Sequence, residues 1–203
     1  MKLYKYKIFI KESKELMMPS RRDIDLMCKK YRIGNYTINE DGTIDVDGDV
    51  RLYNKVLNRL PLKFGKVSGN FYCGNNELKS LEGSPEKVGG YFYCDQNRLT
   101  SLQGSPREVG GGFYCSNNKL TSLEGSPRSV GDDFYCSYNQ LTSLEGISKY
   151  ISGLGLINFE SNKLIDVKGV KDGWRGRFYV EDNPVHQIFK LFPKERWDEV
   201  MNI

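Results

Sequence analysis

The chain has little of what metal and nucleophilic chemistry requires. Its 203 residues include one histidine, His186, and two tryptophans. The five cysteines form no Cys-x-x-Cys pair and no histidine accompanies them, so the spacing of a zinc site is missing. No phosphate-binding loop and no nucleophile with a partner base can be read from the spacing. We therefore expect a protein that is not an enzyme and that binds neither a metal nor a cofactor.

Long hydrophobic runs are missing as well. No stretch approaches the roughly 20 apolar residues that a helix needs to span a bilayer. The N-terminus carries lysines but no signal-peptide stretch beyond residues 8–10. We expect a cytosolic protein that is not associated with membranes. The formal charge of +4 belongs to residues 1–31, which hold nine Lys/Arg against four Asp/Glu; the remaining chain is nearly neutral.

What the sequence does have is a 21-residue repeat. Residues 69–89, 90–110 and 111–131 share the frame F-Y-C-x-x-N-x-L-x-S-L-x-G-S-P-x-x-V-G. A fixed period of this size indicates a solenoid, in which each unit buries its apolar side against its neighbours. One asparagine recurs in the same phase over six units. These asparagines are Asn76, Asn97, Asn118, Asn139, Asn162 and Asn183.

The repeated apolar positions predict the core. We expect the asparagine of each unit to bond backbone groups of the next turn, because the bend would otherwise leave them unpaired. We interpret the cysteine in each frame as a small reduced core residue, which argues against an oxidising compartment. The predicted inward columns begin with Phe71, Phe92, Phe113, Phe134, Ile157 and Phe178, and with Cys73, Cys94, Cys115, Cys136, Phe159 and Val180.

The stretch from Phe113 to Leu120, F-Y-C-S-N-N-K-L, resembles the leucine-rich-repeat core L-x-L-x-x-N-x-L. The resemblance implies an α/β-type solenoid, a short leucine-rich-repeat array with a parallel β-sheet on its concave face. Residues 50–68 read as a degenerate first unit, with Lys55 where asparagine would stand. The expected divisions are residues 1–13 as a separate N-terminal segment, 14–49 as an N-terminal helix and hairpin cap, 50–183 as the solenoid and 184–203 as a C-terminal helical cap.

Local signals support both expected caps. Ser20 reads as the N-cap of a helix over residues 20–31, with Asp23 three positions later. Residues 36–46 alternate about a turn and predict a hairpin. Near the other end, residues 185–192 and 194–202 carry helical apolar spacing interrupted by Pro193.

The sequences of the repeats and of the first 13 residues resemble sequences of proteins from large tailed bacteriophages. The units, together with the phrase T-I-N-E-D-G-T-I-D-V-D-G-D-V, look like leucine-rich-repeat proteins of such phages. Residues 1–13, M-K-L-Y-K-Y-K-I-F-I-K-E-S, resemble the capsid-targeting peptide of T-even-type internal proteins, which implies cleavage between Glu12 and Ser13 and packaging in the phage head. The alternative is a first β-strand or an exposed basic tail. The expected location is the host cytoplasm.

Strand alternation places a second set of side chains outside the core, on the expected concave face. Seven of the 13 tyrosines fall there, with five carboxylates and one arginine. A nucleic-acid groove needs cations, so nucleic acid is disfavoured. Tyrosine is enriched at protein interfaces, so we expect a monomer that binds a host protein through a basic element. The candidate binding residues are Tyr72, Tyr91, Tyr93, Asp95, Tyr114, Tyr135, Tyr138, Glu160, Arg177, Tyr179 and Glu181.

Other interpretations remain open. In-register tyrosines could stack on one another only to stabilise the sheet. The chain could be a structural or internal component of the virion. Asp41, Asp45, Asp47 and Asp49 suggest calcium, but they lack the EF-hand glycine and glutamate phases, and turn carboxylates explain them better. His186 is most simply a residue of the C-terminal cap.

Overall fold

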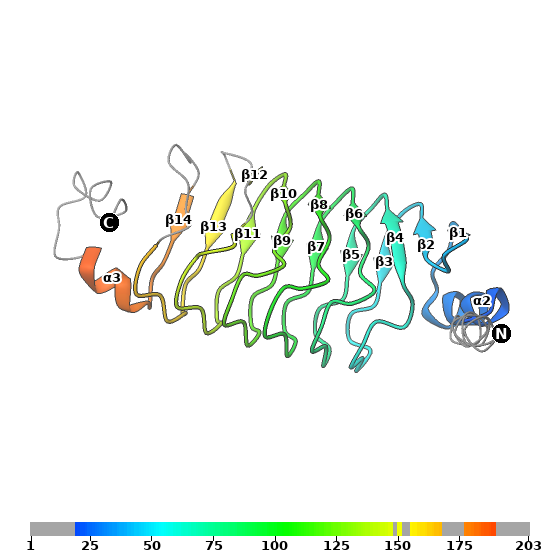
Figure 1. Ribbon diagram of the computed structural model, residues 1–203, viewed down its shortest axis with the longest axis horizontal. Coiled ribbons are helices and arrows are strands. Elements are labelled where there is room, and N and C mark those ends of the chain that lie inside the picture. The colour runs from blue at the N-terminus through cyan, green and yellow to red at the C-terminus, as the bar shows by residue number, and fades with distance from the viewer. Residues whose placement is uncertain (1–18, 148–149, 152–154, 168–176, 190–203) are drawn as a thin grey trace, which may run out of the picture.

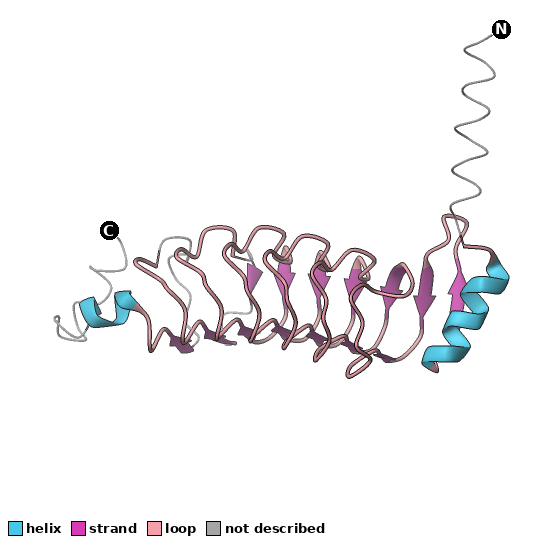
Figure 2. Cartoon of the chain, turned by 90° about the horizontal axis from the view of Figure 1, so that it is seen from below, coloured by secondary structure: helices cyan, strands magenta, loops and turns pink. Residues whose placement is uncertain are grey.

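The structure is a β-solenoid whose turns stack side by side along its long axis (Figure 1). It is a computed structural model, and it describes residues 19–147, 150–151, 155–167 and 177–189. The turns form a nearly straight row in both views (Figures 1 and 2), so the face predicted to be concave is close to flat.

Two seven-stranded sheets build the solenoid, one on each of two sides (Figure 2). The first sheet has the order β1-β2-β4-β6-β8-β10-β12, and the second has the order β14-β13-β11-β9-β7-β5-β3. The first comprises β1 (Tyr36–Ile38), β2 (Ile44–Val46), β4 (Phe64–Val67), β6 (Lys87–Val88), β8 (Glu108–Val109), β10 (Ser129–Val130) and β12 (Tyr150–Ile151). The second comprises β3 (Val50–Arg51), β5 (Phe71–Tyr72), β7 (Phe92–Tyr93), β9 (Phe113–Tyr114), β11 (Phe134–Tyr135), β13 (Leu156–Asn158) and β14 (Arg177–Tyr179).

The second sheet corresponds to the predicted one, whereas of the first sheet only the hairpin strands, β1 and β2, were predicted. Its repeated part comes from the S-P-x-x-V-G segment of each frame, where strands of two residues place Val88, Val109 and Val130 in the core. Each of these strands has one inward valine between turn residues, so it gives no period-2 pattern, whereas the F-Y-C segment of the second sheet has an inward Phe and an inward Cys on either side of an outward Tyr. The expectation of an α/β-type solenoid was wrong for the described repeats, which contain no helix between β3 and β13.

In-register ladders of identical side chains fill the core. The Phe71, Phe92 and Phe113 rings stack with centroids 5.3–5.4 Å apart and interplanar angles of 4–7°. All five cysteines of the chain are buried and free, as predicted for the four in the repeats. Identical side chains lie next to one another because each residue of a parallel strand pairs with the equivalent residue one turn away.

The buried asparagines hold consecutive turns together. The side-chain amide of Asn118 donates to the carbonyl oxygens of Cys94 (3.0 Å) and Cys115 (3.1 Å), and its Oδ1 accepts from the Leu99 amide (3.0 Å). Cys94 and Leu99 belong to the preceding turn, so the predicted role is confirmed but its direction was wrong. The same pattern recurs at Asn97 and Asn183.

Helices lie at both ends of the row (Figure 1). Helix α2 (Arg21–Tyr31) begins with the predicted Ser20–Asp23 capping box, and the predicted hairpin is β1 paired antiparallel with β2. Ile24 and Cys28 of α2 belong to the core, and the Tyr36 hydroxyl donates to Asp25 at 2.7 Å. At the other end, α3 (Pro184–Phe189) contains His186. The leucine-rich-repeat class and the capping role of the helices stay predictions.

Two predicted segments lie outside the described residues. They are the targeting peptide over residues 1–13 and the second C-terminal helix over residues 194–202. Within the described residues, no helix has the length and apolar character needed to cross a membrane.

We predict that Asn118→Ala destabilises the solenoid by about 1–3 kcal/mol, because it leaves the buried Leu99 amide without its acceptor. It also removes one of the two side-chain donors to the carbonyl oxygens of Cys94 and Cys115, which keep their bonds from Asn97 and Asn139. The measurement is the free energy of unfolding from urea denaturation. The matched control is Lys119→Ala, an exposed neighbour, which we expect to change stability by less than about 0.5 kcal/mol. Equal stability of the two variants would contradict the stabilising role of the asparagine ladder.

Candidate binding face

Four tyrosines on the second sheet form one continuous stack, which we call the tyrosine ladder: Tyr72, Tyr93, Tyr114 and Tyr135. Consecutive ring centroids are 4.9, 4.7 and 4.9 Å apart, and the interplanar angles are 4°, 17° and 11°. Each tyrosine follows the inward phenylalanine of its strand, so the two side chains point to opposite sides of the sheet. The structure thus brings together four of the predicted binding residues.

The stacking determines which atoms of the tyrosine ladder a partner can reach. Each inner ring is covered on both faces by its neighbours, so the ring edges and the phenol hydroxyl groups remain for contact. All four side chains are half-buried. Burial raises the pKa of Tyr93, Tyr114 and Tyr135, and for Tyr114 the carboxylate of Asp133 adds to the shift. At neutral pH these hydroxyl groups are therefore protonated and available as donors.

A guanidinium group covers the first end of the tyrosine ladder. Arg51 pairs in register with Tyr72, and its guanidinium carbon lies 5.1 Å from the centroid of that ring. The same guanidinium forms a 2.8 Å ion pair with Asp49. Sequence analysis missed Arg51, although it stands 21 residues before Tyr72 and so occupies the tyrosine position of its unit.

Tyr91 enlarges the aromatic surface beside the tyrosine ladder. Its ring centroid lies 6.1 Å from that of Tyr93 and 6.2 Å from that of Tyr114. Its hydroxyl donates to the carboxylate of Asp132 at 3.2 Å, and this bond is the main reason why the pKa of Tyr91 is raised. Tyr91, which was among the predicted binding residues, is therefore held against the tyrosine ladder.

Acidic and hydroxyl residues border the tyrosine ladder on the other side. The position after the inward cysteine holds Gly74, Asp95, Ser116 and Ser137 in successive turns, and the equivalent position of the last two turns holds Glu160 and Glu181. Burial raises the pKa of Asp95. The Ser137 hydroxyl and the Ser116 hydroxyl are 2.9 Å apart and hydrogen-bonded, so the middle of this border is neutral and the carboxylates lie near its ends.

The remaining predicted residues lie apart from the tyrosine ladder. Tyr179 and Arg177 belong to β14, and Asn158 separates Tyr179 from Tyr135 in the register. Tyr138 is 59% exposed, at a corner where its φ is 54°. Glu12 and Ser13 fall outside the described residues.

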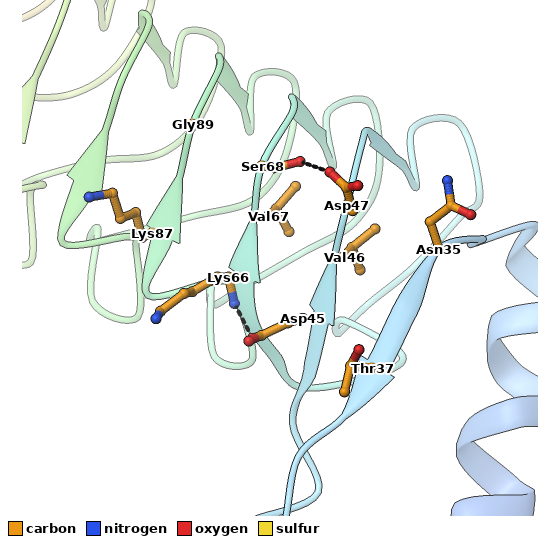
Figure 3. Close-up of a pocket in the computed structure, with 10 residues that line it drawn as sticks. All are labelled: Asn35, Thr37, Asp45, Val46, Asp47, Lys66, Val67, Ser68, Lys87 and Gly89. Atoms are coloured by element: carbon orange, nitrogen blue, oxygen red, sulfur yellow. Dashed lines mark hydrogen bonds between the residues drawn. The ribbon is translucent and has the colours of Figure 1, made fainter.

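A second candidate site is a cavity of about 330 Å³ on the first sheet, beside the hairpin (Figure 3). Its polar groups are largely engaged with one another. Asp45 accepts from the Lys66 backbone amide at 2.7 Å, and the Ser68 hydroxyl donates to Asp47 at 2.8 Å. The Lys87 ammonium, which also lines the cavity, pairs with Glu108 at 2.8 Å. Because carboxylates and ammonium groups both line this cavity and its polar groups are largely engaged, its lining does not indicate one class of ligand.

No group of three or more His, Cys, Asp or Glu side chains in the described part of the chain is arranged to hold a metal ion. Burial raises the pKa of the Cys73, Cys94 and Cys115 thiols, so these core cysteines stay protonated near neutral pH. Comparison of the chain with protein-family models, with curated proteins and with solved structures found no match. The case for a binding face therefore rests on the geometry of the tyrosine ladder and its border.

We predict that the tyrosine ladder makes stability fall in alkaline solution. Tyrosine ionises near pH 10 in the unfolded chain, whereas the pKa values of Tyr93, Tyr114 and Tyr135 are raised in the fold. Their contribution is complete below about pH 10 and is lost as pH rises through the folded values, because the unfolded chain releases its protons first. The measurement is the melting temperature between about pH 8 and pH 12.

The control for this prediction is the triple variant Tyr93→Phe, Tyr114→Phe, Tyr135→Phe, which keeps the rings and removes the titrating hydroxyl groups. We expect its melting temperature to fall less steeply above about pH 10 than that of the original chain. Identical slopes would contradict the raised pKa values.

Proposed function

We propose that the chain is a non-enzymatic protein-binding module, and that the tyrosine ladder with its acidic border is the binding face. The observation that carries this proposal is the mutual covering of the tyrosine rings. It leaves a strip of ring edges and hydroxyl donors, bordered by carboxylates. Tyrosine supplies large contact area at low entropic cost, and here the stacking has already fixed the side chains.

The stacking also argues against two other ligand classes. Single-stranded nucleic acids stack their bases on open aromatic faces and need cations along the backbone. The inner rings of the tyrosine ladder have no open face. Of the described cations at the ladder, Arg51 is already paired with Asp49, and Asp95, Asp133 and Glu160 outnumber Arg177. A protein partner with a basic element fits this combination best.

The phage assignment rests on the sequence resemblance. On that reading the module acts in the host cytoplasm as a monomer that captures a host protein, for host takeover or counter-defence. Packaging in the phage head and a structural role in the virion are the alternatives. The leucine-rich-repeat class, with its capping helices, belongs to the same proposal.

The test of the binding face uses immobilised protein to capture partners from a bacterial lysate, followed by calorimetry with the purified partner. We expect the triple variant of Tyr93, Tyr114 and Tyr135 to phenylalanine to bind at least about tenfold more weakly, since each hydrogen bond contributes about 0.5–1.5 kcal/mol. Its fold is kept, because the stack remains. Affinity should also fall as salt concentration rises.

The matched control removes three hydroxyl groups from the strandless side of the solenoid, through Thr100→Val, Thr121→Val and Thr142→Val. These threonines are exposed and repeat every 21 residues, as the tyrosines do. We expect this variant to bind normally. If the threonine variant lost binding and the tyrosine variant kept it, the partner would bind the strandless side, and the proposed binding face would be wrong.

The packaging alternative has its own test in the mass spectrum of proteins from purified virions. If residues 1–13 contain the targeting signal, the chain in the particle begins at Ser13, because cleavage follows Glu12. A chain in the particle that still begins at Met1 contradicts the cleavage. Absence of the chain from particles contradicts packaging and leaves the binding face as proposed.

A further inference from the structure

The tyrosine ladder is interrupted once near its C-terminal end. Tyr135, Asn158 and Tyr179 are in-register neighbours on β11, β13 and β14. Adjacent strands are about 4.8 Å apart, so the two tyrosines start from backbones about 9.6 Å apart. One face of the Tyr135 ring covers Tyr114, and no described aromatic ring stacks on its other face. We call the space between Tyr135 and Tyr179, above Asn158, the slot.

Asn158 is held away from the space that a third ring would fill. Its amide nitrogen donates to the Glu160 carboxylate at 2.8 Å, and its Oδ1 accepts from the Glu160 backbone amide at 2.9 Å. Both bonds join residues of the same turn. The side chain therefore lies along the sheet and forms the floor of the slot, with the Glu160 carboxylate beside it.

The dimensions of the slot fit one flat group. A planar group midway between the tyrosines would lie about 4.8 Å from each ring, the same separation as between strands. The rings of the tyrosine ladder are themselves 4.7–4.9 Å apart. A cation within about 6 Å of an aromatic centroid is attracted to the ring face, and two rings act on it from both sides.

The other end of the tyrosine ladder shows which flat group this surface accepts. There the Arg51 guanidinium lies 5.1 Å from the Tyr72 ring and pairs with Asp49 at 2.8 Å. The slot offers the same two elements, an aromatic face and a carboxylate, and in the described part of the chain no cation lies over the Tyr135 or Tyr179 ring as Arg51 lies over Tyr72. Glu181 follows Glu160 in the acidic border, and its buried Oε2 has no hydrogen-bond partner among the described residues.

We propose that the slot receives an arginine side chain of the protein partner, with the guanidinium between Tyr135 and Tyr179 and its N–H groups directed to Glu160. This inference rests on the proposed function and specifies the chemistry of the partner. Arginine fits better than lysine because the guanidinium is planar and stacks, whereas the ammonium is compact and strongly hydrated. Of the described charged residues on the strands and turns around the slot, the carboxylates of Asp133, Glu160 and Glu181 outnumber the single cation, Arg177.

The first test titrates the full chain with three blocked tripeptides, Gly-Arg-Gly, Gly-Lys-Gly and Gly-citrulline-Gly, and follows the tyrosine ring resonances by NMR. We expect saturable shifts at Tyr135 and Tyr179 with the arginine peptide and smaller changes at Tyr93. The lysine peptide should bind several-fold more weakly, and the uncharged citrulline peptide should produce no saturable shift. Absence of a saturable shift with the arginine peptide would overturn the proposal.

The decisive variant is Asn158→Tyr, which fills the slot with a fifth consecutive ring. We expect the variant to fold, with a melting temperature at least equal to that of the original chain, and to lose the arginine-peptide shift at Tyr135. Tyr179→Leu removes one wall without filling the slot and should weaken the shift at Tyr135. Unchanged arginine binding in the Asn158→Tyr variant would show that the peptide binds elsewhere and would overturn the slot.

The purified partner separates this inference from the proposed function. If Asn158→Tyr binds the partner as tightly as the original chain, while the triple phenylalanine variant does not, the slot is wrong and the binding face stands. If the triple phenylalanine variant also binds normally, the binding face itself is wrong. Loss of partner binding in both variants supports both proposals.

Discussion

The structure depends on one constraint, which is that each strand residue pairs with the equivalent residue of the next turn, 21 positions away between β5 and β11 and 23 positions away between β11 and β13. Parallel in-register strands fix this correspondence, and the asparagine ladder closes each corner on the turn before it. The glycines at the corners depend on the same register, because it brings the backbones of consecutive turns into close contact there. A Cβ at Gly110 would collide with the Gly89 carbonyl oxygen, so the turns approach too closely for any side chain there. Stacked phenylalanines and stacked tyrosines follow from the same register.

The sequence predicted those parts of the fold that repeat identically. The inward phenylalanines and cysteines, the asparagine corners and the tyrosine positions were all found from period and alternation, because every unit supplies another observation of the same environment. The repeated strands of the first sheet were missed because each carries a single inward valine between turn residues, whereas F-Y-C in the second sheet has two inward residues that alternate with tyrosine. The flat shape of the binding face could not be read from sequence either, since the curvature of a solenoid depends on small rotations between turns.

For the candidate site, sequence reasoning found the members of the tyrosine ladder but not its chemistry. Alternation placed Tyr93 and Tyr114 outside the core, yet it could not show that their rings would cover each other and leave only edges and hydroxyl groups. That outcome depends on side-chain rotamers, which the repeat allows but does not determine. Arg51 and Asn158 were overlooked for a different reason, since a search for repeated residues passes over positions where the repeat changes.

Those departures from the repeat are the positions best able to give specificity. A uniform ladder presents the same atoms every 4.8 Å or so, and a partner could slide along it by one turn without losing contacts. Arg51 closes one end with a guanidinium, and Asn158 opens a single slot near the other. If the slot receives a side chain as proposed, it gives the face one register, because a side chain inserted there cannot move to the next turn. On the same proposal, the stack supplies a repetitive surface, and its interruption at Asn158 supplies the position at which that surface selects one partner.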